Sequence, residues 1–341
     1  MTNVVVVGAG RWAHDAWGPL LLEHAARFTV AAVVDPDLDG ARSLARSLGL
    51  EAGACHETVD EALDQAAVVE AGVVLNPPDQ HARTIVHLAE RGLHVLTEKP
   101  LATDPDDLDL ILRAVRHAGV KAAVIQNYRY QNRIRVARRI LAAGELGRLR
   151  YLVARFAADY RAPGAWHGDR SNVLVDTAIH HVDVLRYLAG AEITHVTAVT
   201  ANPDPSLFAS DCLGGLLIRF DDGSFALYEA TLLAAGSENR WRTVSYRAEC
   251  SDGALVCDGP EVRLLGGRHI QSIPAPDTDR LDGHRHQLRA FADWLDGGPA
   301  VETTIEDNSR SMAAVFAALT SDRARSTVPV AAASSPAQRR G

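Results

Sequence analysis

The first third of the chain alternates short apolar runs with longer segments of helical periodicity. The runs are rich in β-branched residues and lack the polar–apolar alternation of a half-exposed strand; they span residues 3–7, 28–34, 73–75, 93–96 and 121–125. Strands of this kind are typical of parallel sheets that helices cover on both faces. The pattern predicts a doubly wound α/β domain over residues 1–125.

After residue 126 strand-like runs become more frequent than helical segments. Two helical segments, near 130–143 and 175–188, flank a strand-like run at 150–157. Further runs are separated by turn residues such as Asp221-Asp222-Gly223; they span 196–200, 213–220, 224–231, 242–247 and 254–258. This spacing predicts a second domain, of α+β class with a largely antiparallel sheet, over residues 126–330. Two helices close it, near 283–295 and 306–320, and residues 331–341 are expected to form a flexible tail.

The composition is that of an ordinary folded protein. Its 341 residues correspond to two domains at roughly 150 residues each. With 47% hydrophobic and 23% charged residues, the chain is too apolar for disorder to dominate. The net charge is -8, and the basic residues form no continuous run. We therefore expect no nucleic-acid partner, because a phosphate backbone attracts basic surfaces.

Cysteine usage and hydropathy indicate a cytoplasmic protein. The four cysteines form no C-x-x-C pair, and four in a chain of this length are too few for a disulfide framework. The first residues lack the basic and apolar regions of an export signal, and no segment approaches the length of apolar sequence that spans a membrane. We expect neither export nor membrane insertion.

A glycine-rich turn follows the first predicted strand. The sequence Gly8-Ala9-Gly10-Arg11-Trp12-Ala13 matches G-x-G-x-x-G/A between a strand and a helix, where it binds a dinucleotide pyrophosphate. Asp35 ends the second strand, where a carboxylate can bind ribose hydroxyls and repel a 2′-phosphate. The motif predicts NAD as cofactor; NADP stays open because Arg11 and Trp12 are bulky. The alternative is a glycine turn in a domain that binds no nucleotide.

Two more polar groups follow strands of the same predicted sheet. Asn76-Pro77-Pro78 and Glu98-Lys99-Pro100 come at the carboxyl ends of neighbouring strands, where open α/β sheets bind ligands. The Lys99 ammonium can polarise a substrate oxygen there and, unlike arginine, can release its proton when partly buried. The alternative is a solvated surface pair of Glu98 and Lys99.

The second half contains one helical segment with a candidate acid–base pair. Asp176, His180 and Asp183 are spaced so that a helix places them on one narrow face. A carboxylate one turn from an imidazole can orient its ring and raise its basicity, which suits removal of a hydroxyl proton. A helix with ordinary solvated side chains is one alternative, and a metal site with His181 is another. We expect no metal, because His181 points about 100° away from His180.

Taken in order, these motifs resemble those of the glucose–fructose oxidoreductase/inositol dehydrogenase/MocA family along nearly the whole chain. The resemblance also covers His81, Asn127-Tyr128-Arg129 and Gly144-x-x-Gly147. The run from Asp176 to Leu185 is particularly similar to the inositol 2-dehydrogenase branch. The resemblance implies a Rossmann domain, followed by an α+β domain whose large open sheet forms the interface of a homodimer or homotetramer.

The family also implies roles for individual residues. The catalytic group would be Lys99, Asp176 and His180. The cofactor-binding residues would be Gly8, Gly10, Arg11, Trp12, Ala13, Asp35, Asn76, Pro77, His81, Glu98 and Lys99. The substrate-binding residues would be Lys99, Tyr128, Arg129, Tyr160, Trp166, Asp176, His180 and Asp183.

The leading functional hypothesis is hydride transfer between nicotinamide and a ring hydroxyl or ketone of a sugar or cyclitol. One alternative is reduction of a keto-sugar, with nucleotide-linked sugars included, or of an imine in a biosynthetic pathway. Another is a non-catalytic regulator that binds NAD(P). The combination of Lys99, Asp176 and His180 argues against the regulator, which would not need all three.

Overall fold

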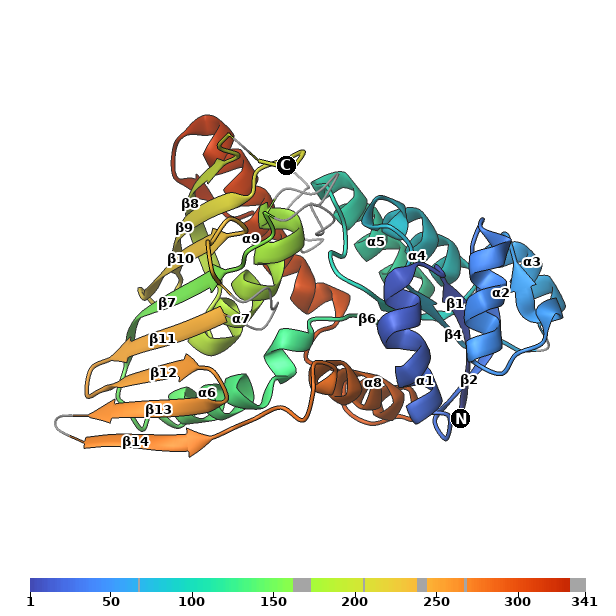
Figure 1. Cartoon of the computed structure of the whole chain (residues 1–341), viewed down its shortest axis with the longest axis horizontal. Coiled ribbons are helices and arrows are strands. Elements are labelled where there is room, and N and C mark those ends of the chain that lie inside the picture. The colour runs from blue at the N-terminus through green and yellow to red at the C-terminus, as the bar shows by residue number, and fades with distance from the viewer. Residues whose placement is uncertain (67, 162–172, 205, 238–243, 267–268, 332–341) are drawn as a thin grey trace. The chain divides into compact units, whose positions relative to one another are not determined.

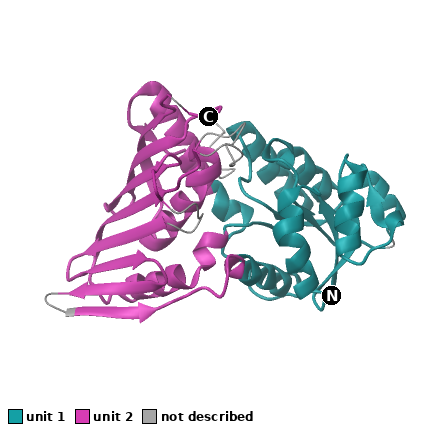
Figure 2. Ribbon diagram, in the orientation of Figure 1, with its two compact units in different colours: residues 1–126, 284–309 teal, residues 127–283, 310–341 magenta. Residues whose placement is uncertain are grey.

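The computed structural model describes the chain except for residues 67, 162–172, 205, 238–243, 267–268 and 332–341 (Figure 1). The chain divides into two compact units (Figure 2). Unit 1 contains residues 1–126 and 284–309, and unit 2 contains residues 127–283 and 310–341. No helix within the described ranges is long and apolar enough to cross a membrane.

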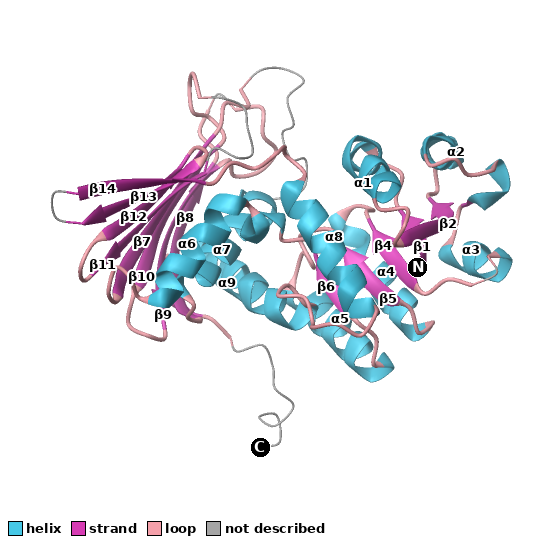
Figure 3. Ribbon diagram, turned by 90° about the horizontal axis from the view of Figure 1, so that it is seen from below, coloured by secondary structure: helices cyan, strands magenta, loops and turns pink. Residues whose placement is uncertain are grey.

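Unit 1 is built on a six-stranded parallel sheet. Its strands are β1 (Thr2–Val7), β2 (Phe28–Val34), β3 (Cys55–His56), β4 (Ala71–Val74), β5 (His94–Thr97) and β6 (Ala122–Val124), in the order β3-β2-β1-β4-β5-β6. Figure 3 shows α1 (Gly18–Glu23) and α2 (Leu38–Ser47) on one face, and α3 (Val59–Gln65), α4 (His81–Glu90) and α5 (Pro105–Ala118) on the other. The strand order reverses between β1 and β4, and ligands bind such sheets at this switch point.

The segment 284–309 returns to unit 1 after the chain has built most of unit 2. It includes most of α8 (Asp282–Leu295) and the start of α9 (Ile305–Ala324). Arg285 pairs with Glu23 (2.8 Å), Lys121 Nζ donates to the Trp294 carbonyl oxygen (2.5 Å), and Val124 N–H donates to the Thr303 carbonyl oxygen (2.9 Å). The first boundary, after residue 126, lies next to the predicted one at 125. The segment 284–309 was predicted to belong to the second domain, which ends at 330, but it belongs to unit 1 because these contacts join segments far apart in sequence. Of the predicted tail, 331–341, only residue 331 is described.

Unit 2 is built on a nine-stranded sheet in the order β14-β13-β12-β11-β7-β10-β9-β8-β15. The strands are β7 (Leu149–Ala157), β8 (Ile193–Ala201), β9 (Leu213–Phe220), β10 (Phe225–Thr231), β11 (Val244–Cys250), β12 (Ala254–Asp258), β13 (Glu261–Gly266), β14 (His269–Pro274) and β15 (Val328–Pro329). Every pairing is antiparallel except that of β7 with β10. The predicted fold class, a doubly wound domain followed by a mostly antiparallel α+β domain, is confirmed.

One face of this sheet carries the helices of unit 2. Figure 3 shows α6 (Asn132–Ala143), α7 (Ile179–Ala189) and the unit 2 part of α9 on the same side. In β10 the side chains alternate between buried, such as Tyr228, and exposed, such as Leu227, as the two-residue period of a strand requires. The helices cover the buried set, so α7 lies on the core face of the sheet.

Candidate active site

The turn after β1 has the shape of a pyrophosphate cradle. Gly8 adopts φ +107°, and a Cβ there would lie 2.5 Å from the backbone nitrogen of Asn76, so only glycine fits between the ends of β1 and β4. A Cβ at Gly10 would meet nothing within 4 Å, which leaves open space in front of the turn. The residues therefore fit a dinucleotide whose phosphates approach the backbone at Gly10.

The segment after this turn begins with a π-helical turn, Ala13–Trp17, and continues as α1. Such turns occur often at functional sites. Ala13 is buried, as close packing of helix and sheet requires, whereas Trp12 is 39% exposed. Arg11 does not join this packing: its side chain is 93% exposed and its Nε donates to Asp15 (3.1 Å).

The Asp35 carboxylate is held beside the glycine turn. Its Oδ2 accepts a hydrogen bond from Ala9 N–H (2.7 Å), and its Oδ1 accepts one from Asp37 N–H (2.8 Å). Each carboxylate oxygen has a second lone pair, so ribose hydroxyls can still donate to it. The fixed negative charge also disfavours a 2′-phosphate, which fits NAD better than NADP.

His81 connects the ends of two strands. Its ring is fully buried, with Nδ1 2.8 Å from the Pro100 carbonyl oxygen and Nε2 2.9 Å from the Asn76 carbonyl oxygen. Burial lowers the pKa of His81, although these two contacts act in the opposite direction. The Asn76 side chain donates to Thr84 (2.8 Å), and Pro77 lies exposed beside it. His81 thus holds the residues after β4 against those after β5.

The residues after β5 are organised by the Glu98 carboxylate. Glu98 is only 9% exposed, and its Oε1 accepts hydrogen bonds from the indole N–H groups of Trp12 (2.8 Å) and Trp17 (2.9 Å). His284 Nε2 lies 3.9 Å from the same oxygen. Lys99 is half-buried, and its backbone N–H donates to Glu98 Oε2 (3.2 Å).

In unit 2, Asp176 and His180 lie where a π-helical turn, Leu174–Ala178, runs into α7. Both side chains are less than a tenth exposed. The Tyr128 ring stacks on the His180 ring with centroids 4.4 Å apart and planes 16° apart, which fixes the imidazole. Burial, followed by the charge of Asp176, raises the pKa of Tyr160 to about 12, so its hydroxyl stays protonated.

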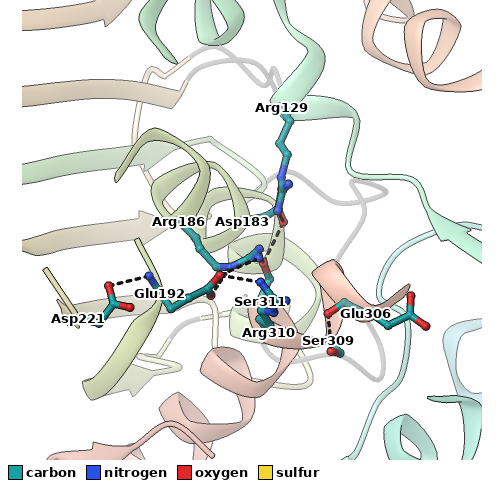
Figure 4. Close-up of polar contacts among 9 residues, drawn as sticks. All are labelled: Arg129, Asp183, Arg186, Glu192, Asp221, Glu306, Ser309, Arg310 and Ser311. Carbon is teal, nitrogen blue, oxygen red and sulfur yellow. Dashed lines mark hydrogen bonds and ion pairs between the residues drawn. The ribbon is translucent and has the colours of Figure 1, made fainter. Parts of the chain in front are cut away.

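Asp183, on the same helix as His180, forms a buried ion pair with Arg129 (Figure 4). Arg129 Nε and Nη2 donate to the two carboxylate oxygens at 2.5 and 2.7 Å, and Ser311 Oγ donates to Oδ1 at 2.9 Å. The side chains of Arg129 and Asp183 are 4% and 1% exposed. Because Tyr128 precedes Arg129, this pair also holds the ring that stacks on His180.

The structure therefore groups the predicted residues within each unit. In unit 1 the glycine turn lies with Asp35 and Asn76, and Trp12 lies with Glu98. In unit 2, Tyr128 lies with His180 and Arg129 with Asp183. Trp166 lies outside the described residues. Among the described residues, no group of three or more His, Cys, Asp or Glu side chains is arranged to hold a metal ion.

Sequence reasoning missed several residues of these clusters. Ser311 was not identified, no role was assigned to His284, and Trp17 was not connected with Glu98. Trp17 lies 81 positions from Glu98, and Ser311 lies 128 positions from Asp183. No local pattern in the sequence could connect residues at these separations.

Comparison with known proteins identifies the family of this chain. Residues 2–126 match the model of the GFO/IDH/MocA oxidoreductase family with an NAD-binding Rossmann fold, and residues 134–256 match the C-terminal domain of this family. The chain is 30% identical to an inositol 2-dehydrogenase of Rhizobium meliloti over 89% of this chain and 92% of that protein. It is 27% identical to the scyllo-inositol 2-dehydrogenase (NAD(+)) of Bacillus subtilis over 85% of each.

A solved structure shares the fold over nearly the full length. It is an oxidoreductase from Agrobacterium radiobacter in complex with NAD+, L-tartaric acid and magnesium, with a TM-score of 0.87 and 17% identity over 96% of this chain and 98% of that one. The resemblance inferred from the motifs is thus confirmed, and the chain belongs to the GFO/IDH/MocA family of oxidoreductases, with an NAD-binding Rossmann domain at residues 2–126.

Proposed function

We propose that the protein is a dehydrogenase that transfers a hydride between NAD and a ring hydroxyl or ketone of a sugar or cyclitol. The observation that carries the proposal is the buried cluster where the π-helical turn Leu174–Ala178 runs into α7: His180, held against Tyr128, with Asp176 one turn before it. An imidazole fixed in this way suits removal of a hydroxyl proton near neutral pH. The inositol dehydrogenases among the relatives support a polyhydroxylated ring as substrate.

The proposed reaction divides the work among three side chains. His180 removes the proton of the substrate hydroxyl, and Asp176, one turn before it, orients the imidazole. The Lys99 ammonium stabilises the negative charge that develops on the substrate oxygen. Bound NAD supplies the nicotinamide carbon that accepts the hydride from the substrate carbon. General base catalysis of this kind contributes about 10²–10⁴-fold in rate.

The remaining predicted substrate residues receive two kinds of role. We assign Tyr128 and Tyr160 to the substrate side of the His180 and Asp176 cluster. The Tyr160 hydroxyl, whose pKa is raised to about 12, would donate a hydrogen bond to a ring oxygen. Arg129 and Asp183 already bind each other, so we assign them to holding this cluster in place.

Variants of the catalytic residues test this assignment. His180→Ala and Lys99→Ala are each expected to lower kcat by about 10²-fold or more, because each removes one group that acts on the reacting oxygen. Calorimetry should find NAD affinity unchanged in both variants. Loss of NAD binding together with kcat would assign these residues to the cofactor instead, and an unchanged kcat would remove them from the reaction.

We also propose that the protein is a cytoplasmic homo-oligomer that associates through the sheet of unit 2. On the face without helices, the strand register aligns Leu217, Leu227 and Val153 in one row, and Phe225 stacks on Tyr151 (5.3 Å). Leu227 is 44% exposed and Val199 is 65% exposed. A cytoplasmic location suits the four cysteines, which form no disulfide. Leu227→Glu should lower the mass found by sedimentation equilibrium, and an already monomeric wild type would refute this interface.

A further inference from the structure

Glu98 lies where three segments of unit 1 meet. Oε1 accepts hydrogen bonds from both indoles of the segment after β1, and Oε2 accepts one from the backbone N–H of Lys99. The third segment is the start of α8, where the buried His284 ring lies 5.7 Å from the Trp12 ring and 6.4 Å from the Trp17 ring. A buried carboxylate is costly unless hydrogen bonds satisfy it, and here neutral N–H donors satisfy it.

The π-helical turn explains how two tryptophans reach one oxygen. Trp12 and Trp17 are five residues apart, and on an α-helix residues at this spacing point about 140° apart. Directly after Trp17, Gly18 N–H donates to the Ala13 carbonyl oxygen five residues back, which is the hydrogen bond of a π-helix. The wider turn brings residues five apart toward the same side. The local backbone thus departs from regular α-helix where the two indoles converge on Glu98.

The arrangement joins the two parts of unit 1 that the reaction needs. Trp12 is part of the glycine-rich turn, two residues after Gly10, and Lys99 directly follows Glu98. The carboxylate therefore fixes the backbone at Lys99 relative to the turn that binds the cofactor phosphates. A displacement of about 1 Å in a catalytic group can cost about 10²-fold in rate.

We propose that Glu98 is a positioning residue that ties the strand end carrying Lys99 to the cofactor-binding turn carrying Trp12. In this assignment Glu98 acts through its indole hydrogen bonds, rather than as one of the cofactor-binding residues that the family resemblance implies. The proposal rests on the proposed function, because it takes Lys99 as the group that acts on the substrate oxygen.

The lysine content of the chain allows a test that does not depend on turnover. The sequence contains two lysines, Lys99 and Lys121, so reductive methylation with ¹³C-formaldehyde gives one dimethyl-lysine NMR signal for each. Lys121 Nζ lies 5.8 Å from the Trp294 ring centroid and serves as the internal reference. Lys99→Arg and Lys121→Arg assign the two signals.

Three variants alter the hydrogen bonds of Glu98, and a fourth serves as a matched control. Trp12→Phe and Trp17→Phe each keep an aromatic ring and delete one N–H donor, and Glu98→Gln keeps the shape and deletes the charge. Each should shift the Lys99 signal and leave the Lys121 signal in place. Trp294→Phe, the same substitution elsewhere in unit 1, should do the reverse. Trp12 is partly exposed, so its variant is expected to fold even where that of the buried Trp17 does not.

Kinetics supply the second readout. The three cluster variants should lower kcat by about 10–100-fold, keep the NAD dissociation constant within about threefold and leave KM for the substrate nearly unchanged. An unmoved Lys99 signal in Glu98→Gln and Trp12→Phe overturns the positioning role, whatever the activity. A moved Lys99 signal with unchanged kcat also overturns it. A wild type that oxidises no sugar or cyclitol refutes the proposed function instead, and the NMR result then stands by itself.

Discussion

Replacing Arg129 with methionine should destabilise unit 2 strongly. The substitution keeps most of the side-chain volume and deletes a guanidinium that donates to both oxygens of Asp183 at 2.5 and 2.7 Å. Only the Ser311 hydroxyl, at 2.9 Å from Oδ1, would remain among the donors described above. With the carboxylate side chain 1% exposed, water cannot replace the lost hydrogen bonds. Removing one partner of such a buried pair costs about 3–5 kcal/mol.

A surface pair on the sheet of unit 2 provides the control. Arg155 and Glu229 lie 3.3 Å apart with side chains 63% and 56% exposed, so Arg155→Met should cost only about 0.2–1 kcal/mol. Combining Arg129→Met with Asp183→Leu should recover much of the lost stability, because neither charge is then left buried and unpaired.

Urea unfolding followed by circular dichroism measures the free energy of unfolding for each variant. Amide hydrogen exchange along α7 reports the opening of unit 2 specifically. The reasoning is refuted if Arg129→Met costs no more than Arg155→Met, or if the double variant is less stable than Arg129→Met by itself.

Three further predictions follow from the geometry of unit 1. Gly8→Ala should weaken NAD binding by at least about 10²-fold in calorimetry, whereas Gly49→Ala, also at positive φ but facing open space, should leave it intact. Burial and the charge of Lys121 lower the pKa of His94, whose Nδ1 accepts a hydrogen bond from Lys121 N–H (3.0 Å). Below about pH 6.5 the unfolded chain therefore binds more protons at this site, so the free energy of unfolding should fall as the pH drops. Urea denaturation at several pH values should show a weaker dependence of this free energy on pH in His94→Gln. Asp35→Ser should shift the ratio of NADP to NAD affinity toward NADP by about tenfold, and an unchanged ratio would contradict the role of this carboxylate.

Local patterns were sufficient to predict much of unit 1. The apolar runs at 3–7 and 28–34 coincide with β1 and β2 because strands covered on both faces are continuously hydrophobic. The glycine turn was identified because its motif lies between a strand and a helix, the context in which it binds a dinucleotide. The two-residue strands β3 and β15 were not predicted, since two residues carry no periodicity.

What was not predicted depends on contacts between distant residues. The strands β13 and β14, at one end of the sheet, were missed because polar and apolar side chains mix in them. The return of 284–309 to unit 1 depends on partners such as Glu23 and Lys121, which sequence patterns do not connect. The π-helical turns likewise leave no hydrophobic period of their own. The spacing of Asp176 and His180 was read on a regular α-helix, and the structure places a π-helical turn at the first of them.

The most direct test of the proposed function is the absorbance of reduced nicotinamide when the purified protein receives NAD or NADP with inositols, aldoses and amino-cyclitols. We predict that the band grows with one class of ring polyol and faster with NAD than with NADP. Tight NAD binding without turnover of any polyol, and without oxidation of NADH by the corresponding keto-sugars, would contradict the assignment and favour a regulator that binds the dinucleotide.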